Sequence, residues 1–226
     1  SQAETVHQTL DGWIPAPETE VVQIAGWGLY TIAGLQAEDE KICQFDSNQL
    51  IGGRPVCTEN HNSLTVSDKL TLNGDATVLV PSALDMTESA QVKKYWVDLE
   101  EYNSTLSFNK DRFHKDILEV DTLRPFIKSL IKNNISDTEN DYIATSQPVS
   151  RNTRYTKYEI HSPLHLTVTD SLGKVTGWDA ETGTIIESIK GAQYFEMGEI
   201  KTILIPKDTP HTVKLTAYAE GSFTLS

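Results

Sequence analysis

The sequence has little positive charge. Lys and Arg number 19 against 32 Asp and Glu, which gives a formal net charge of −13 at neutral pH. A protein that binds duplex nucleic acid normally carries a basic face that displaces counterions from the phosphates. The same deficit disfavours charge-driven docking on an anionic membrane. We therefore expect no nucleic-acid partner.

Long apolar runs are also absent. The longest, such as Thr202–Ile205, have the length of a strand, whereas a membrane-spanning helix needs about 20 apolar residues. The first residues, Ser1–Thr5, are polar and acidic and lack the features of a signal peptide. Because no Met begins the chain, we expect a mature or truncated product. Because the apolar runs are short, we expect no transmembrane segment.

Cysteine is scarce, with two residues among 226. Cys43 and Cys57 flank the turn-prone segment Gly52–Pro55, and a hairpin at that segment would bring them together. A disulfide closing such a loop stabilises by about 3 kcal/mol. Two reduced and partly buried thiols are the alternative. We take the pair Cys43 and Cys57 as a disulfide candidate.

The chain divides into two parts of different pattern, 1–135 and 136–226. Strand-like runs alternate with helical patterns in the first part, whereas helical patterns are missing from the second. The segment Asn133–Asp141 between them is polar and turn-prone, as a linker is. The composition, with 38% hydrophobic and 23% charged residues, is ordinary for a globular protein with a real core.

The first part predicts an α/β arrangement. Glu20–Gly26 has the composition of a buried strand, and Leu64–Leu72 leads into a Gly-Asp turn. Segments 31–35 and 43–56 predict a small antiparallel excursion between them. Ser89–Leu99 fits neither a helical nor a strand period. Apolar residues at three-and-four spacing predict a helix that begins at Asp116 or Asp121.

The second part is a succession of short alternating runs separated by Gly- and Asp-containing turns. Regular short strands of this kind are typical of an antiparallel β-sandwich. The predicted strands are 156–160, 164–168, 184–189, 201–205, 212–218 and 221–225.

Two residues of the first part are candidates for catalysis. Asp75 follows the strand-like run that ends at Leu72, and His114 comes just before the predicted helix. An acid that orients a histidine base forms two-thirds of a nucleophile triad. The alternatives are an Asp that bonds the backbone of its own turn and a surface histidine before a helix.

The segments around these residues resemble a known family. Gly74–Val78 resembles the Gly-Asp-Gly-Thr-Val-Pro segment of lipase-like α/β-hydrolases, in particular the lecithin:cholesterol acyltransferase-like group. Phe113–Leu118 is similar to the family's His-x-x-Ile-Leu segment, and Gln23–Gly28 with Thr31 resembles the strand and turn that precede the acid. The resemblance covers roughly residues 20–132. It implies that Asp75 is the triad acid and His114 the catalytic base.

The chain departs from the family pattern in two ways. Ala76 stands where the family usually has Gly, and Leu79 where it often has Pro. More importantly, no Ser has glycines two positions before and two after it, so the nucleophile elbow is missing. Ser82 and Ser89 lack such an elbow and are poor nucleophile candidates. The chain looks like the C-terminal half of the enzyme, and we expect it to be inactive alone.

The other polar residues predict no metal and no cofactor. His161 and His165 would share a face of a strand, but no third ligand accompanies them, so we interpret both as surface residues. Asp170 and Asp179 are followed by glycines in a pattern that loosely resembles a calcium loop. Hairpin turns account for both.

The leading hypothesis is a C-terminal portion of a secreted or cell-surface lipase or acyltransferase, a partial α/β-hydrolase sheet followed by a sandwich that serves as an accessory module. Its partners would be a lipid or other ester substrate in the intact enzyme. A half sheet would expose strand edges near Val21 and Leu70, so we also expect the missing N-terminal half or a homo-oligomer partner. One alternative is a non-catalytic secreted or cell-surface binding or adhesion protein with a hydrolase-like first domain. The other is a two-domain surface protein without hydrolase ancestry.

Overall fold

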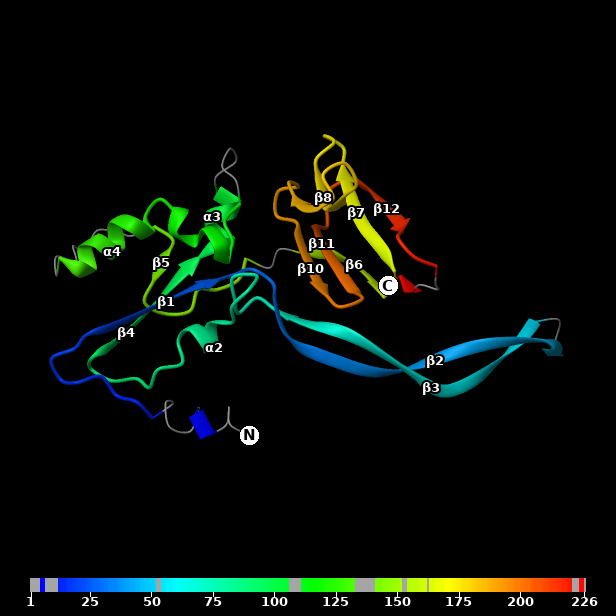
Figure 1. The fold of residues 1–226 in the computed structure, drawn as a ribbon, viewed down its shortest axis with the longest axis horizontal. Helices are drawn as coiled ribbons and strands as arrows, with labels where there is room; N and C mark the ends of the chain where they lie inside the picture. The colour runs from blue at the N-terminus through cyan, green and yellow to red at the C-terminus, as the bar shows by residue number, and fades with distance from the viewer. Residues whose placement is uncertain are drawn as a thin grey trace. The chain divides into compact units, whose positions relative to one another are not determined.

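The computed structural model consists mostly of β-strands with few helices (Figure 1). It describes residues 5–6, 12–51, 54–105, 111–132, 141–151, 154–161, 163–220 and 224–225, without the side chains of 38–51, 54–65 and 224–225. The chain forms two compact units, one made of Ile32–Leu70 and the other of Ser1–Thr31 with Thr71–Ser226. Within the described residues, no helix is both long and apolar enough to cross a membrane.

A three-stranded sheet organises the first part of the chain. Its order is β1 (Val21–Trp27), β4 (Val92–Asp98) and β5 (Ile143–Ala144). Strands β1 and β4 are parallel, with Ile24 opposite Tyr95, and β5 is antiparallel to β4. The strand predicted at 20–26 is confirmed by β1. The ambiguous segment 89–99 forms β4 and then begins the helix α3 (Leu99–Thr105).

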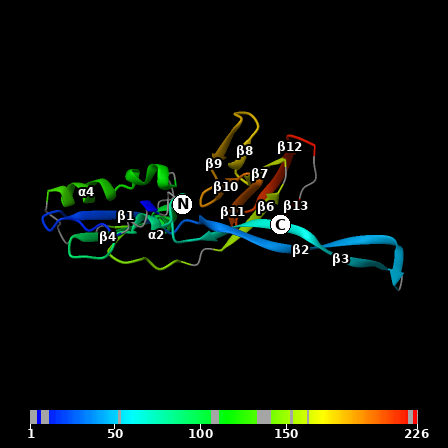
Figure 2. The same ribbon diagram turned by 60° about the horizontal axis from the view of Figure 1, so that its bottom comes forward.

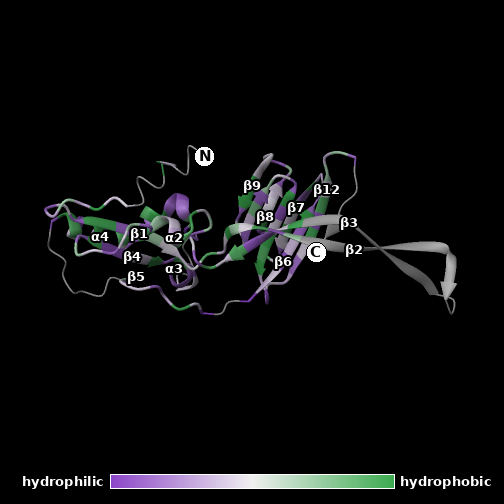
Figure 3. Ribbon diagram, turned by 90° about the horizontal axis from the view of Figure 1, so that it is seen from below, coloured by the Kyte–Doolittle hydropathy of each residue, from purple (hydrophilic) through white to green (hydrophobic). Residues whose placement is uncertain are grey.

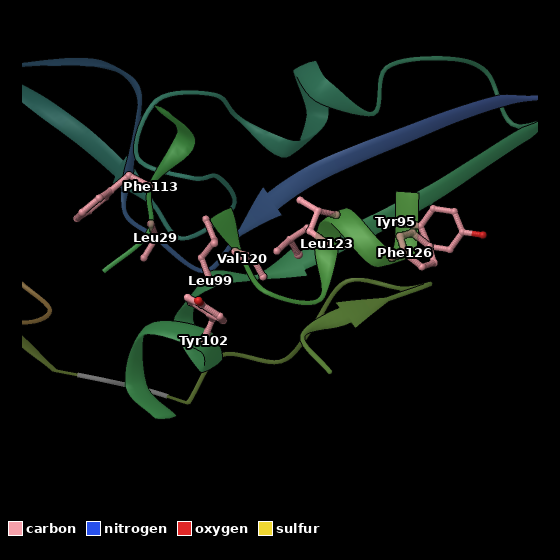
Figure 4. Packing of buried hydrophobic residues seen from close by; sticks show 9 residues of the cluster. Leu29, Tyr95, Leu99, Tyr102, Phe113, Val120, Leu123 and Phe126 are labelled. Carbon is pink, nitrogen blue, oxygen red and sulfur yellow. The ribbon is translucent and has the colours of Figure 1, made fainter. Parts of the chain in front are cut away.

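Helices cover one face of this sheet (Figure 2). The predicted helix forms as a 3₁₀ helix, η1 (His114–Glu119), followed by α4 (Leu123–Ile131), and Asp116 has non-helical angles inside η1. The core beneath them is shown in Figure 4 and contains Leu29, Tyr95, Val97, Leu99, Tyr102, Phe113, Val120, Leu123 and Phe126.

A smaller apolar cluster lies on the opposite face of β1. The short helix α2 (Val80–Ala83) packs there, and the buried members of the cluster are Ala25, Trp27, Val80 and Leu84. Side chains alternate along a strand, so Ala25 and Trp27 face away from the side to which Ile24 contributes. Apolar packing on both faces is expected of a parallel strand pair.

The second part forms two four-stranded antiparallel sheets, consistent with the predicted sandwich. One has the order β10 (Gln193–Met197), β11 (Ile200–Pro206), β6 (Tyr155–His161) and β13 (Thr224–Leu225). The other has the order β12 (His211–Ala217), β7 (Leu164–Asp170), β8 (Val175–Asp179) and β9 (Thr184–Glu187).

Both sheets contribute to one apolar core, and hydrophobic and hydrophilic residues alternate along their strands (Figure 3). The buried residues include Ile160 and Ile203 from one sheet and Leu166 and Val168 from the other. Strands β8 and β10 were not predicted from the sequence. The predicted boundary near residue 135 lies outside the described residues.

The unit Ile32–Leu70 is built from a long hairpin. It pairs β2 (Thr31–Ile51) with β3 (Arg54–Thr71), where the sequence predicted only a small antiparallel excursion. Leu70 therefore belongs to the hairpin and not to an edge of the three-stranded sheet, which corrects that prediction. The side chains of Cys43 and Cys57 lie outside the described ones, so their disulfide stays a prediction.

Candidate active site

The carboxylate of Asp75 is buried and firmly held. The residue is 4% exposed and lies in the turn between β3 and α2. Its Oδ1 accepts hydrogen bonds from the backbone N–H groups of Val78, at 2.7 Å, and Thr77, at 3.2 Å. Asp75 thus bonds its own turn with one oxygen and keeps the other, Oδ2, for a second partner.

That partner is His114. Its Nδ1 lies 2.8 Å from Oδ2 of Asp75, and its backbone N–H donates to the Asp75 carbonyl at 3.1 Å. Because an ionised carboxylate only accepts hydrogen bonds, Nδ1 carries the proton, and in the neutral ring Nε2 is left with a free lone pair. The His114 side chain is 47% exposed, and Nε2 has no hydrogen-bond partner among the described residues.

The end of β1 leaves room for Asp75. A Cβ atom on Gly26 would lie 2.6 Å from the Cβ of Asp75, so a larger residue there would displace the acid. The buried Thr31 holds the next residue, because its Oγ1 accepts from the N–H of Ala76 at 2.9 Å and donates to the Leu29 carbonyl at 3.1 Å. Gly26 and Thr31 thus both fix the position of the turn that carries Asp75, which we call the acid loop.

Ala76 adopts a left-handed backbone conformation, with φ at 75°. This region is costly for any residue with a Cβ atom, and glycine occupies it freely. A glycine at this position would adopt the same φ angle without strain. Ala76 tolerates the conformation at a cost in stability.

Hydrogen bonds fix the segment Asp111–Phe113, which precedes His114. The side chain of Asn103 in α3 donates from Nδ2 to the Arg112 carbonyl at 3.0 Å and accepts from the Arg112 N–H at 2.8 Å. The Phe113 N–H donates to Oδ1 of Asp116 at 2.6 Å. Asp111 accepts a hydrogen bond of 2.7 Å from the N–H of Gly191 in the sandwich.

A cavity of about 140 Å³ lies beside this segment. Residues from the first part and from the sandwich line it, among them Leu29, Phe113 and Tyr155. Burial raises the pKa of Tyr155 to about 12, and burial also raises the pKa of Asp111 above its ordinary value. Asp75 and His114 are not among the lining residues, so the cavity is next to the pair and separate from it.

The histidines and aspartates of the sandwich that the sequence singled out have structural partners. His161 Nε2 lies 2.8 Å from Oε1 of Glu159, and the ring of His165 stacks on Trp178 with centroids 4.0 Å apart. The carboxylates of Asp170 and Asp179 accept backbone N–H groups of their own turns. In the described part of the chain, no group of three or more His, Cys, Asp or Glu could hold a metal ion.

No hydroxyl group of a described residue hydrogen-bonds to His114. Ser82 lies in α2 and Ser89 precedes β4, and neither contacts the imidazole in this way. The residues that the sequence did not single out are Asn103, Asp111 and Gln193. All three bond backbone groups of other segments, and Asp111 and Gln193 do so across 80 and 163 positions, which leaves no local pattern in the sequence.

Comparisons with protein-family models, with curated proteins and with solved structures each found no match for this chain.

Proposed function

We propose that Asp75 and His114 are the acid and base of a serine-hydrolase triad, in the C-terminal portion of a lipase- or acyltransferase-like α/β-hydrolase. One observation carries the proposal: a buried, doubly anchored carboxylate bonds the Nδ1 of a half-exposed histidine whose Nε2 is free. The carboxylate keeps the ring in the tautomer that a general base requires.

The chemistry follows from that tautomer. A serine hydroxyl attacks the carbonyl carbon of an ester while Nε2 of His114 takes its proton. Asp75 stabilises the imidazolium, which then protonates the alcohol as the ester C–O bond breaks. Water removes the acyl group in a hydrolase, and a second alcohol removes it in an acyltransferase.

The nucleophile belongs to a segment outside these 226 residues. The sequence has no Gly-x-Ser-x-Gly elbow, and β1 lies at an edge of its three-stranded sheet. Parallel strands normally lie inside a larger sheet that is covered on both faces. A further strand beside Val21–Trp27, from the rest of the enzyme, would extend the sheet and bring the serine.

The substitution Asp75→Asn tests the proposal in protein produced together with the coding sequence that precedes Ser1. The two N–H groups at Oδ1 orient the new amide so that its NH₂ group faces His114. Nδ1 must then accept, and Nε2 carries the proton and cannot act as a base. We expect kcat for short-chain ester hydrolysis to fall by about 10⁴-fold.

Thr182→Ala is the control, because it removes a hydrogen bond to Asp179 in an exposed turn of the sandwich. It should leave the rate unchanged. Ester hydrolysis that survives both Asp75→Asn and His114→Ala at the normal rate would refute the assignment. No ester hydrolysis by the unmodified protein would favour a non-catalytic binding or adhesion protein.

A further inference from the structure

A turn of the sandwich, Ile189–Gln193, contacts Tyr30 after the end of β1 and Asp111 in the segment that carries His114; we call this turn the brace. Gln193 is 3% exposed, and its side chain bonds the backbone of Tyr30 twice. Oε1 accepts from the Tyr30 N–H at 3.1 Å, and Nε2 donates to the Tyr30 carbonyl at 3.1 Å. Both polar groups of the amide therefore bond the backbone of one residue.

The second contact of the brace is on the histidine side. The N–H of Gly191 donates to Oδ2 of Asp111 at 2.7 Å, three residues before His114. Gly191 has a φ of 74°, so the turn uses a conformation that favours glycine. Ile189 and Ala192 are 3% and 1% exposed, which fixes the brace in the body of the sandwich.

Each contact is linked to the pair through neighbouring residues. Tyr30 precedes Thr31, whose Oγ1 accepts the N–H of Ala76, the neighbour of Asp75. On the other side, the backbone runs from Asp111 to His114. The brace, the acid loop and the histidine segment therefore form a closed ring of contacts, which the Asp75–His114 hydrogen bond completes.

We infer that the brace sets the geometry of the pair, with Gln193 and Asp111 as positioning residues, so that the sandwich is part of the scaffold of the active site. The inference deepens the proposed function and rests on it for its catalytic meaning. The geometry itself can be measured without any reaction.

The test is NMR of the His114 imidazole in the purified chain. A ring held by Asp75 gives a low-field Nδ1–H proton and the ¹⁵N shifts of the Nδ1–H tautomer. Gln193→Ala and Asp111→Ala should each speed the exchange of this proton with water on the order of tenfold, since each removes hydrogen bonds of ordinary strength. They should also shift the ring toward the Nε2–H tautomer.

Asp111→Asn is the rescue variant, because its amide oxygen can still accept from Gly191. It should keep the signal of the unmodified chain, and so should Thr182→Ala elsewhere in the sandwich. Backbone amide spectra check that each variant remains folded. If one alanine variant unfolds, the comparison of the other with its controls decides.

Folded alanine variants with unchanged exchange and tautomer would overturn the inference while leaving the proposed function intact. An unmodified chain without the Nδ1–H signal would overturn both, since the pair itself would be absent. A signal that depends on the brace, in an enzyme whose rate ignores Asp75→Asn, would support the positioning geometry and refute the proposed function.

Discussion

The carboxylate of Asp75 hydrogen-bonds both the backbone of its own turn and the ring of His114. Oδ1 is occupied by two backbone N–H groups and Oδ2 by His114, so the two roles considered for this residue do not compete. The pair could be predicted from the sequence because the residues that carry it lie in short motifs. The support from Asp111 and Gln193 could not, since side chains that bond a backbone 80 and 163 positions away have no local signature.

The left-handed conformation of Ala76 gives a prediction about stability. Ala76→Gly removes the steric cost of the Cβ atom, which exceeds the extra entropy that glycine adds to the unfolded chain. We expect the free energy of unfolding to rise by about 0.5–1 kcal/mol, measured by chemical denaturation.

Ala217→Gly in the exposed strand β12 is the matched control, because φ is not positive there. It should destabilise by about 0.5–1 kcal/mol. Equal losses in the two variants would show that Ala76 is unstrained.

At the scale of elements, burial explains which strands could be predicted. β4 fits no period because Tyr95 and Val97 face one apolar cluster and Trp96 the other. Apolar packing on both faces removes the alternation that marks a half-buried strand. In β8, Gly177 has a φ of 112° and interrupts the pattern, and in β10 one of the two inward positions is the polar Gln193.

The contact between Asp111 and the brace predicts a pH dependence. Burial raises the pKa of Asp111 above 3.8, and the Gly191 N–H, Lys190 and Lys174 oppose the shift. The folded chain therefore binds this proton more tightly than the unfolded chain does. Its contribution to stability is present at low pH and is lost as pH rises from 3.8 through the raised pKa.

Asp111→Asn removes this titration. We expect the variant to gain in melting temperature over the unmodified chain as pH rises through that window, and to keep the advantage above it. Scanning calorimetry at several pH values measures the difference, with Thr182→Ala as a non-titrating control. A difference that is flat or that shrinks with rising pH would contradict the assignment.

At the scale of the whole molecule, the hairpin is a separate unit inserted between the end of β1 and the acid loop. The Gly28 N–H donates to the Leu72 carbonyl at 3.1 Å, and Leu29 bridges to Asp75, so the chain leaves and re-enters at adjacent points. All the hydrogen bonds described for the Asp75–His114 pair join residues of the unit Ser1–Thr31 with Thr71–Ser226, and none involves the hairpin unit.

Excision of residues 32–70, with a short glycine linker from Thr31 to Thr71, should therefore preserve the pair. We expect the low-field Nδ1–H signal of His114 to persist, and to disappear when Asp75→Asn is added. Loss of the signal in a folded excision variant would show that the hairpin supports the site.

The most direct measurement is labelling with a fluorophosphonate, which reacts with an activated serine, in protein that includes the sequence preceding Ser1. The label should attach to a serine outside these 226 residues, and His114→Ala or Asp75→Asn should abolish it. Label on Ser82, Ser89 or another serine of this chain would contradict the account, as would labelling that does not depend on His114.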